Sequence, residues 1–423
     1  MKITFISTND TVGGAAIVTL RLMEALRGLG EDARMVVARK KSDNEWVSEV
    51  SRRRWQRAFL TERAEIFFRS GFNRRDIWKV DTGRYGCGVT EHPWVAEADV
   101  VVLAWVNQGM VSLDDLARLH RMGKKIVWTM HDMWCATGIC HHSCDCLRYT
   151  TMCGRCPYLG SNSGATDLST QVQLAKERLY GEVPIQFVAV SRWLGEICRK
   201  SSLLKDKDVA VVPNAMPVER YNPHPAMSRE EAGLPAAGAL IVLAAARLDD
   251  PIKDLPLAIE ALNRLNDMPL PQRSVAVLCG ALKDEHALEG LRLPYVYLGS
   301  IDDPERMAAI FGHAAVVLSS SVRETLPGTL IEGMAAGAVP VTTGHGGQRD
   351  IVEHGIDGYI LPPDTPADEA AEELAQLMRR AIEHPFDREA QHAAAARRYA
   401  ASAVARRFHA DIGERNRERP SYV

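Results

Sequence analysis

The stretch 315–342, which reads AVVLSSSVRETLPGTLIEGMAAGAVPVT, decides the fold of this 423-residue chain. It opens with an apolar run at 315–319, passes through a polar loop into a helix-forming segment at 328–336, and ends in a second apolar run at 339–342. Apolar runs that alternate with helical segments indicate parallel strands joined by crossover helices. The stretch therefore predicts one strand–helix–strand unit of a doubly wound α/β domain.

The same alternation continues on both sides of this unit. Further strands are expected at 2–7, 35–38, 100–104, 125–130, 186–190, 239–246, 274–279 and 295–298. Because 423 residues exceed one ordinary core, we predict two doubly wound, Rossmann-like domains that face each other across a cleft at the carboxyl ends of their strands. The expected boundaries are 1–217 for the first domain, 218–395 for the second, and 396–423 for a helical tail that packs back on the first. A cysteine-rich insertion covers 132–164.

Composition narrows the class of protein. A formal net charge of −3 argues against a dedicated nucleic-acid binder, which would be strongly basic. The sequence has no apolar run of the roughly 18 residues that a membrane span needs. The N-terminus shows a strand pattern without a signal-peptide cleavage site, so we expect the protein in the cytosol.

Four charged residues follow strand ends in the second half of the chain. Glu324 and Glu332 flank a strand-to-helix transition, and Arg247 and Lys253 follow the strand at 239–246. Carboxylates accept hydrogen bonds from vicinal hydroxyls, and the two cations suit a diphosphate whose charge grows during bond cleavage. The alternative is an ordinary solvated set of surface charges, with glutamates favoured by the helix dipole.

A glycine pair, Gly13-Gly14, joins the first strand to a helix. Glycines there let a ligand approach the backbone, and the helix start favours an anion. The pair fits neither the dinucleotide fingerprint nor a P-loop. A tight turn without a ligand explains it about equally well.

With Gly13-Gly14, Arg247…Lys253 and Glu324…Glu332 in place, the chain resembles the family 4 retaining glycosyltransferases of the GT-B fold. It is most similar to the branch that builds bacterial exopolysaccharides such as colanic acid, through its elements at 129–134, 137–140 and 153–157. The resemblance implies retaining transfer of a hexosyl group from a UDP- or GDP-sugar to a glycan or lipid-linked acceptor. The nucleotide would bind the second domain and the acceptor the first.

The resemblance also implies a role for each matching residue. Glu324 would contact the donor sugar and Glu332 the ribose, Arg247 and Lys253 would hold the diphosphate, and His131 would reach the transferred sugar. Thr325 and Leu326 complete the expected donor-binding set, together with Gly13 and Gly14. The sequence departs from the family at Asp254, where glycine is usual, which weakens the assignment of Lys253. For His131 the alternative is a buried histidine satisfied by a backbone carbonyl.

No protein nucleophile or catalytic metal is expected. The D-x-D candidate, Asp206-Lys207-Asp208, lies in a polar turn, so catalysis should be metal-independent. Cys140, Cys146, Cys153 and Cys156 have the spacing C-x5-C-x6-C-x2-C, which is compatible with a structural zinc site. Disulfides or free thiols are nearly as compatible with this spacing, and an iron–sulfur cluster less so.

An arginine-rich segment with aromatic residues, between Ser51 and Trp78, suits an anionic membrane surface. It would place the protein peripherally on the inner face of the plasma membrane. A helix that packs on the sheet with a solvated basic face is the alternative. For the whole protein, the alternatives to a transferase are a nucleotide-sugar epimerase of GT-B fold and a noncatalytic sugar-nucleotide-binding protein.

Overall fold

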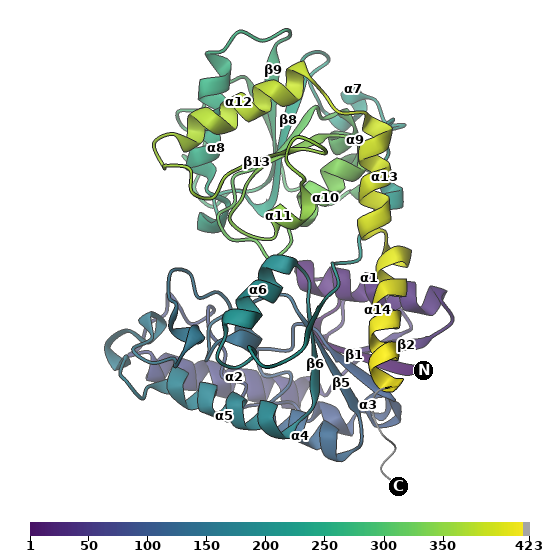
Figure 1. Ribbon diagram of the computed structural model, residues 1–423, viewed down its shortest axis with the longest axis vertical. Coiled ribbons are helices and arrows are strands. Elements are labelled where there is room, and N and C mark those ends of the chain that lie inside the picture. The colour runs from purple at the N-terminus through teal and green to yellow at the C-terminus, as the bar shows by residue number, and fades with distance from the viewer. Residues whose placement is uncertain (418–423) are drawn as a thin grey trace. The chain divides into compact units, whose positions relative to one another are not determined.

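The computed structural model describes residues 1–417 and divides the chain into two α/β units (Figure 1). Unit 1 comprises Met1–Ala215 and the segment from Val404, and unit 2 comprises Met216–Ala403. The observed divisions therefore lie at 215 and 404, where the sequence analysis placed them at 217 and 396. The second division comes later because α13 (Arg388–Tyr399) belongs to unit 2, where His392 Nδ1 lies 2.6 Å from the carbonyl oxygen of Ala335.

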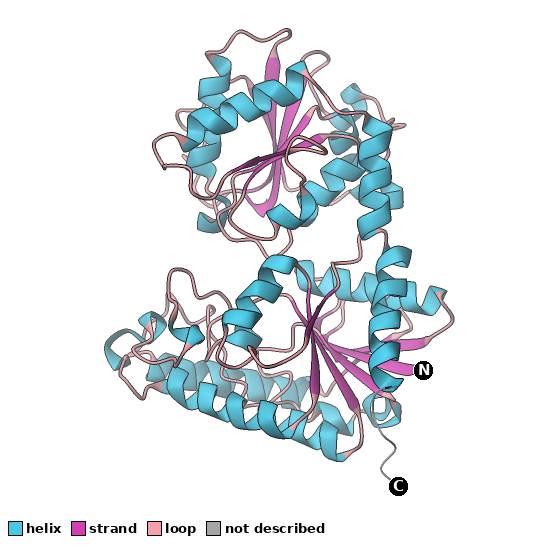
Figure 2. Ribbon diagram, in the orientation of Figure 1, coloured by secondary structure: helices cyan, strands magenta, loops and turns pink. Residues whose placement is uncertain are grey.

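Unit 1 is built on a seven-stranded parallel sheet with the order β3-β2-β1-β4-β5-β6-β7. Figure 2 shows its strands enclosed by helices. The strands are β1 (Lys2–Asn9), β2 (Asp32–Arg39), β3 (Val47–Glu49), β4 (Val100–Leu103), β5 (Lys125–Met130), β6 (Ile185–Ala189) and β7 (Val209–Val211). The helices are α1 (Gly14–Gly28), α2 (Arg52–Arg69), α3 (Pro93–Glu97), α4 (Leu113–Arg121), α5 (Leu168–Glu182), α6 (Arg192–Lys200) and α14 (Ala401–Arg417). The central strands are buried on both faces, as parallel sheets covered by helices require.

Helix α14 belongs to unit 1, although it is far in sequence from the rest of that unit. The ring of Phe408 stacks on Phe5 of β1 with centroids 6.4 Å apart, and Phe408 is fully buried. Gln186 of β6 donates to the Asp411 carboxylate at 2.6 Å. Unit 1 therefore takes part of its core from the end of the chain.

Unit 2 carries a six-stranded parallel sheet with the order β10-β9-β8-β11-β12-β13. Its strands are β8 (Ala239–Arg247), β9 (Ser274–Ala281), β10 (Tyr295–Gly299), β11 (Val316–Ser319), β12 (Val339–Thr343) and β13 (Tyr359–Leu361). Its helices are α7 (Arg229–Ala232), α8 (Leu255–Asn266), α9 (Pro304–His313), α10 (Gly328–Ala335), α11 (Gln348–Ile351), α12 (Ala370–Glu383) and α13. The order reverses between β8 and β11, and ligands bind at such switch points in open α/β sheets.

The expected pair of doubly wound domains is confirmed. The unit at 315–342 is β11, α10 and β12, with register Val316↔Val339. The short strands β3 and β13 escaped the sequence analysis, since three residues carry no usable periodicity. The insertion 132–164 contains only 3₁₀ turns. None of the helices among the described residues is long and apolar enough to cross a membrane.

Candidate active site

Lys253 and Glu324 meet at the carboxyl edge of the unit 2 sheet. The Lys253 ammonium forms an ion pair with Glu324 Oε1, and both side chains are partly exposed. Lys253 ends the 3₁₀ turn Pro251–Lys253, and Glu324 lies in the loop between β11 and α10. Two hydrogen bonds tie these loops together: Ser320 Oγ donates to the Lys253 carbonyl at 2.7 Å, and Val322 N donates to the Ile252 carbonyl at 2.9 Å. The backbone therefore fixes both charged groups at one position.

Arg247, at the end of β8, is held by two carboxylates that the sequence analysis did not single out. Its guanidinium lies 3.3 Å from Asp249 and 3.0 Å from Asp250. Asp250 also accepts a hydrogen bond from Ile252 N at 3.1 Å, at the start of the turn that ends in Lys253. Arg247 and Lys253 therefore stand at opposite ends of one short, hydrogen-bonded loop.

The backbone at Asp254 accounts for the departure from the family's glycine. Asp254 has φ 48° and ψ 55°, in the left-handed region, where glycine is unstrained and aspartate is tolerated better than most residues. It directly precedes α8. The aspartate therefore keeps the turn that glycine would give, while it adds a carboxylate beside Lys253.

A glycine-rich turn after β12, at 344–347, completes this edge and was not identified from the sequence. A Cβ on Gly347 would lie 1.9 Å from the Thr325 carbonyl oxygen, so only glycine lets this turn approach the Glu324 loop. Gly347 N donates to the Glu324 carbonyl at 2.8 Å, and buried Gln348 donates to the Ser321 carbonyl at 2.8 Å. The cluster of glycines in the sequence was the available signal.

Charged side chains act on His345 in this turn. Partial burial, and then the charges of Arg323 and Arg349, hold the pKa of His345 below its usual value, although Asp254 opposes them. Of these causes, only the two arginine charges would also favour an anion, since burial disfavours a charge of either sign. Lys253, paired with Glu324 in the adjoining loop, adds a further cation.

Glu332 lies on α10 and is half-buried. Thr325 and Leu326 precede that helix, and no side chain caps its first turn at Pro327. Unit 2 thus places all four charged residues of the sequence motif on the β8–β11–β12 side of one sheet, at or after strand ends.

In unit 1, Gly13 and Gly14 form the turn between β1 and α1. Gly13 has φ 90°, and the space where either Cβ would stand is open. The buried Asp10 carboxylate accepts hydrogen bonds from Ser42 N at 2.8 Å and Lys41 N at 3.0 Å. Burial acts to raise the pKa of Asp10, but these hydrogen bonds outweigh it and the pKa is lowered. The turn is therefore anchored by the loop that follows β2, while its glycines remain accessible.

His131 directly follows β5 and lines a small cavity with Thr19 and Thr129. Its Nε2 lies 3.5 Å from Thr19 Oγ1. Burial lowers the pKa of His131 to about 4, against the opposing charge of Asp132, so the imidazole is neutral at pH 7. Within the described residues its ring pairs with a hydroxyl, and the backbone-carbonyl partner of the alternative interpretation is not observed.

A buried polar network beside His131 was missed entirely. His141 lies between two carboxylates, with Nδ1 2.7 Å from Asp132 and Nε2 2.6 Å from Asp81. Asp132 also accepts from Trp105 Nε1 at 3.0 Å and from Trp134 N at 2.8 Å. Burial acts to lower the pKa of His141, but the two aspartates raise it to about 10.

Helix α2 supplies the other side of this network. Arg63 pairs with Asp81, and Glu62 lies 3.4 Å from Arg63 while it accepts a hydrogen bond from Thr82 N at 2.8 Å. Burial, and then the charge of Asp81, raise the pKa of Glu62 to about 7. Arg63 belongs to the arginine-rich segment between Ser51 and Trp78 that was expected to form a basic surface, and for this residue the expectation is wrong: Arg63 is buried and is neutralised by Asp81.

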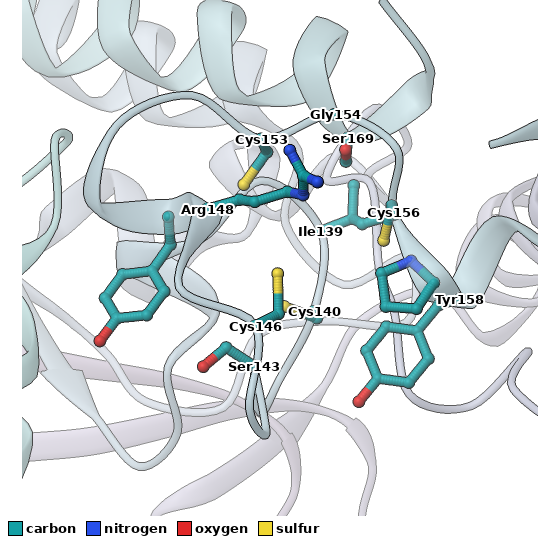
Figure 3. Close-up of a pocket in the computed structure, with 12 residues that line it drawn as sticks. Ile139, Cys140, Ser143, Cys146, Arg148, Cys153, Gly154, Cys156, Tyr158 and Ser169 are labelled. Atoms are coloured by element: carbon teal, nitrogen blue, oxygen red, sulfur yellow. The ribbon is translucent and has the colours of Figure 1, made fainter. Parts of the chain in front are cut away.

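The four cysteines singled out from the sequence line one pocket. Figure 3 shows Cys140, Cys146, Cys153 and Cys156 around it, with Ile139 and Tyr158 in its wall, and Tyr149 also lines the pocket. Within the described part of the chain, no three His, Cys, Asp or Glu side chains are arranged to hold a metal as they stand.

Comparison with known proteins identifies a family for the segment that carries this site. Residues 239–380 match the family model of glycosyl transferases group 1. The chain carries a group 1 glycosyltransferase domain. That segment contains Arg247, Lys253, Glu324 and Glu332, so the resemblance drawn from these residues is confirmed.

Two relatives share parts of the sequence. The colanic acid biosynthesis glycosyl transferase WcaC of Escherichia coli K12 is 28% identical over 112 residues, which is 25% of this chain and 28% of that protein. The phosphatidyl-myo-inositol mannosyltransferase of Mycobacterium tuberculosis is 27% identical over 238 residues, or 54% of this chain and 58% of that protein. The matches therefore span less than two thirds of either relative.

Solved structures match nearly the whole chain. HepE of Anabaena, solved in complex with UDP, is 16% identical, with a TM-score of 0.61 and coverage of 98% of this chain and 100% of that one. WaaG, a glycosyltransferase of lipopolysaccharide biosynthesis, is 16% identical, with a TM-score of 0.63 and coverage of 97% and 99%. These likenesses confirm the GT-B fold.

Proposed function

We propose that this protein is a retaining hexosyltransferase that uses a UDP- or GDP-sugar and glycosylates a glycan or lipid-linked acceptor in bacterial surface polysaccharide synthesis. One observation carries the proposal: the cations Arg247 and Lys253 and the carboxylate of Glu324 gather at the switch-point edge of a group 1 glycosyltransferase domain. The names of WcaC and WaaG and the UDP bound to HepE support it by similarity.

The chemistry follows from charge. As the bond from the anomeric carbon to the phosphate oxygen breaks, negative charge grows on the nucleoside diphosphate, and Arg247 and Lys253 stabilise it. The departing phosphate oxygen takes the proton of the acceptor hydroxyl, whose oxygen bonds to the anomeric carbon on the same face. No protein nucleophile and no catalytic metal take part.

Each remaining residue orients a substrate. Lys253 has three donor hydrogens, so it can bind phosphate while it keeps its contact with Glu324. Glu324 accepts hydrogen bonds from the donor sugar, and Glu332 accepts them from the ribose. Thr325 and Leu326 offer backbone amides at the start of α10. In unit 1 the neutral His131 donates a hydrogen bond to the transferred sugar, and Gly13-Gly14 leaves room for substrate.

A donor panel tests the proposal. The protein is incubated with UDP- and GDP-sugars, and nucleoside diphosphate release is followed with and without lipid-linked acceptors. A transferase shows acceptor-dependent release. An epimerase converts the sugar without release, and a noncatalytic binder shows calorimetric binding alone, so either result would overturn the assignment.

Arg247→Ala should lower turnover about tenfold, which corresponds to a loss of about 1.4 kcal/mol of transition-state stabilisation. The control Arg264→Ala removes an exposed arginine of α8, which also pairs with carboxylates, and should leave turnover unchanged.

A membrane-facing surface supports the lipid-linked acceptor. Phe68 is 60% exposed and Phe72 is 63% exposed, and their rings contact each other with centroids 5.6 Å apart. Exposed arginines lie next to them in sequence (Arg69, Arg74 and Arg75), and further exposed arginines lie in the first turns of α2: Arg52, Arg53, Arg54 and Arg57. Apolar anchors within a basic surface match an anionic bilayer, so the protein would act peripherally on the inner face of the plasma membrane.

Vesicle sedimentation tests this surface. Wild-type protein should bind vesicles that contain phosphatidylglycerol more strongly than neutral phosphatidylcholine vesicles. A double variant, Phe68→Ser with Phe72→Ser, should lose most of this binding. The control Leu174→Ser, an exposed apolar residue of α5, should keep it. Equal sedimentation of all three proteins with both vesicles would refute membrane docking here.

A further inference from the structure

The pocket between Cys140, Cys146, Cys153 and Cys156 has a backbone that is held in place on both sides. On one side, residue 140 forms an antiparallel bridge with Val80. Asp81 N donates to the Ile139 carbonyl at 2.9 Å, and His141 N donates to the Lys79 carbonyl at 3.1 Å. Hydrogen bonds therefore fix Cys140 from both of its neighbours.

The other side is the tight turn Cys153–Cys156. Cys156 N donates to Asp167 at 2.9 Å, and Cys153 N donates to Gln173. A Cβ on Gly154 would lie 2.7 Å from the Ala165 carbonyl oxygen, and Arg155 holds a left-handed φ of 46°. The turn is therefore strained and closely packed. It places two thiols, three residues apart in sequence, at the wall of the same pocket.

Sulfur atoms are the ligands for a soft metal in this pocket, whose lining also contains the hydroxyl groups of Ser143, Tyr149, Tyr158 and Ser169 and the guanidinium of Arg148. Its lining includes the four cysteines, and it includes no histidine or carboxylate among the described residues. Figure 3 shows Cys140 and Cys146 on one side of the space and Cys153 and Cys156 on the other. A set of four thiolates selects zinc or an iron–sulfur cluster over hard cations. Binding requires the thiol side chains to turn inward, because no three of them stand in ligand geometry.

A buried cation next to the pocket points to an anionic occupant. Lys176 of α5 is fully buried, and its ammonium donates to the carbonyls of Trp134 at 2.6 Å and Thr137 at 3.0 Å. Among residues 1–413, no carboxylate lies within ion-pair distance of it. Burial lowers the pKa of Lys176 to about 7, against the opposing effect of the nearby thiols of Cys135, Cys140 and Cys153, and the ammonium lies 3.3 Å from the centroid of the Trp134 ring. A buried charge is costly unless an opposite charge lies near it, and four thiolates around a divalent metal carry a net charge of about −2.

We propose that Cys140, Cys146, Cys153 and Cys156 bind one structural zinc ion, with Lys176 as the cation that offsets the charge of the site. Each thiol gives up its proton to solvent as its Zn–S bond forms. The ion stabilises an insertion that has only 3₁₀ turns and whose small apolar cluster is shared with Ile66, Val80, Leu168 and Val172 outside it. Because Cys140 precedes His141, the ion also fixes the loop whose imidazole holds Asp132 beside His131.

Metal analysis of protein purified without added metal tests the site. Wild-type protein should contain about one zinc per chain. Cys146→Ser and Cys156→Ser should each lower the content at least about tenfold. The matched control is Cys144→Ser, since Cys144 lies in the same loop but is exposed and outside the pocket lining. Zinc lost equally from the control, or iron in place of zinc, would overturn the proposal.

A second measurement avoids variants that fail to fold. Zinc is removed from wild-type protein with a chelator, and Co²⁺ is titrated in. Thiolate-to-cobalt charge-transfer absorption with a tetrahedral visible band should saturate at about one equivalent. The fluorescence of Trp105, which donates to Asp132, should change in parallel. Nine free thiols in a metal-free, unchanged native protein, or an intact mass that shows disulfides, would refute zinc binding.

Discussion

Both units place charged groups at the end of a parallel sheet, but these groups are partly exposed in unit 2 and buried in unit 1. In unit 2 the Lys253 and Glu324 side chains are 31% and 19% exposed, so either can exchange its partner for a ligand. In unit 1, Asp81 and His141 are 1% and 11% exposed and each is already paired on both sides. A site that must bind and release an anion keeps its ions accessible. Ions that only position a neighbour are saturated and buried, and the two kinds of site should respond differently to substitution.

The largest effect is expected from Asp81→Ala in unit 1. Removal of this carboxylate leaves Arg63 and His141 buried without a shared partner, which should lower the free energy of unfolding by about 3–5 kcal/mol. Urea unfolding followed by circular dichroism measures it. Asp114→Ala, on the exposed face of α4, serves as the control. A loss below about 1 kcal/mol would mean that the network does not stabilise the fold.

The next effect belongs to unit 2 and should be kinetic. Glu324→Ala removes a contact made where charge develops, so kcat should fall about a hundredfold while nucleoside diphosphate affinity changes little. Unfolding should be nearly unaffected, because Glu324 is partly exposed. Steady-state turnover and calorimetry measure the two quantities. Glu305→Ala, an exposed glutamate of α9 that also pairs with an arginine, is the control. A variant with normal turnover would contradict the role of Glu324.

Glu332→Ala tests whether the two glutamates of unit 2 have different roles. A ribose contact exists equally in the ground and transition states, so the donor KM should rise about tenfold with kcat within about twofold. Calorimetry should show the matching loss of nucleoside diphosphate affinity. If Glu324→Ala and Glu332→Ala lose binding equally, the sugar and ribose roles are wrongly assigned.

A pH series tests burial in unit 1. The pKa of Glu62 is about 7 in the folded protein, above its ordinary value of 4.5, so the folded state favours the protonated form. Its contribution to stability is fully present below about pH 4.5 and is lost as pH rises through 7. Glu62→Gln imitates the protonated form. It should be more stable than wild type by on the order of 1 kcal/mol at pH 8, and the difference should vanish toward pH 4. A difference independent of pH would show that Glu62 does not titrate there.

The smallest effect is expected at Asp254. Asp254→Gly relieves a left-handed aspartate and should raise stability by a few tenths of a kcal/mol. It also removes a carboxylate beside Lys253, which should lower the donor KM about twofold. Asp254→Ala separates the two causes: it shares the lower KM but is destabilised by about 1 kcal/mol, since alanine is poorly suited to this φ. Equal stability of the two variants would contradict this account of the turn.

The same contrast explains what the sequence could predict. Arg247, Lys253 and Glu324 each follow a strand end, so strand positions alone predict that they share a sheet edge. Asp81 and His141 lie 60 residues apart in segments without strands, and Arg63 sits on a helix whose pattern looks like a basic surface. No local spacing reveals such pairs, because the contact forms only when the loops fold over the sheet. Cysteine spacing was compatible with a structural zinc site but left disulfides, free thiols and an iron–sulfur cluster open, and spacing can specify neither the pocket that the four cysteines line nor the rotation of their side chains.

Because α14 packs on unit 1, it determines the order in which the two units can fold during synthesis. Phe408 and Ile412 are fully buried there, so unit 1 lacks part of its core until residue 412 has been synthesised. Unit 2, in contrast, is continuous in sequence and can fold as soon as residue 403 emerges. Unit 2 can therefore fold before unit 1 is complete, and a fragment that ends at residue 217 would lack the Phe408 ring that stacks on Phe5.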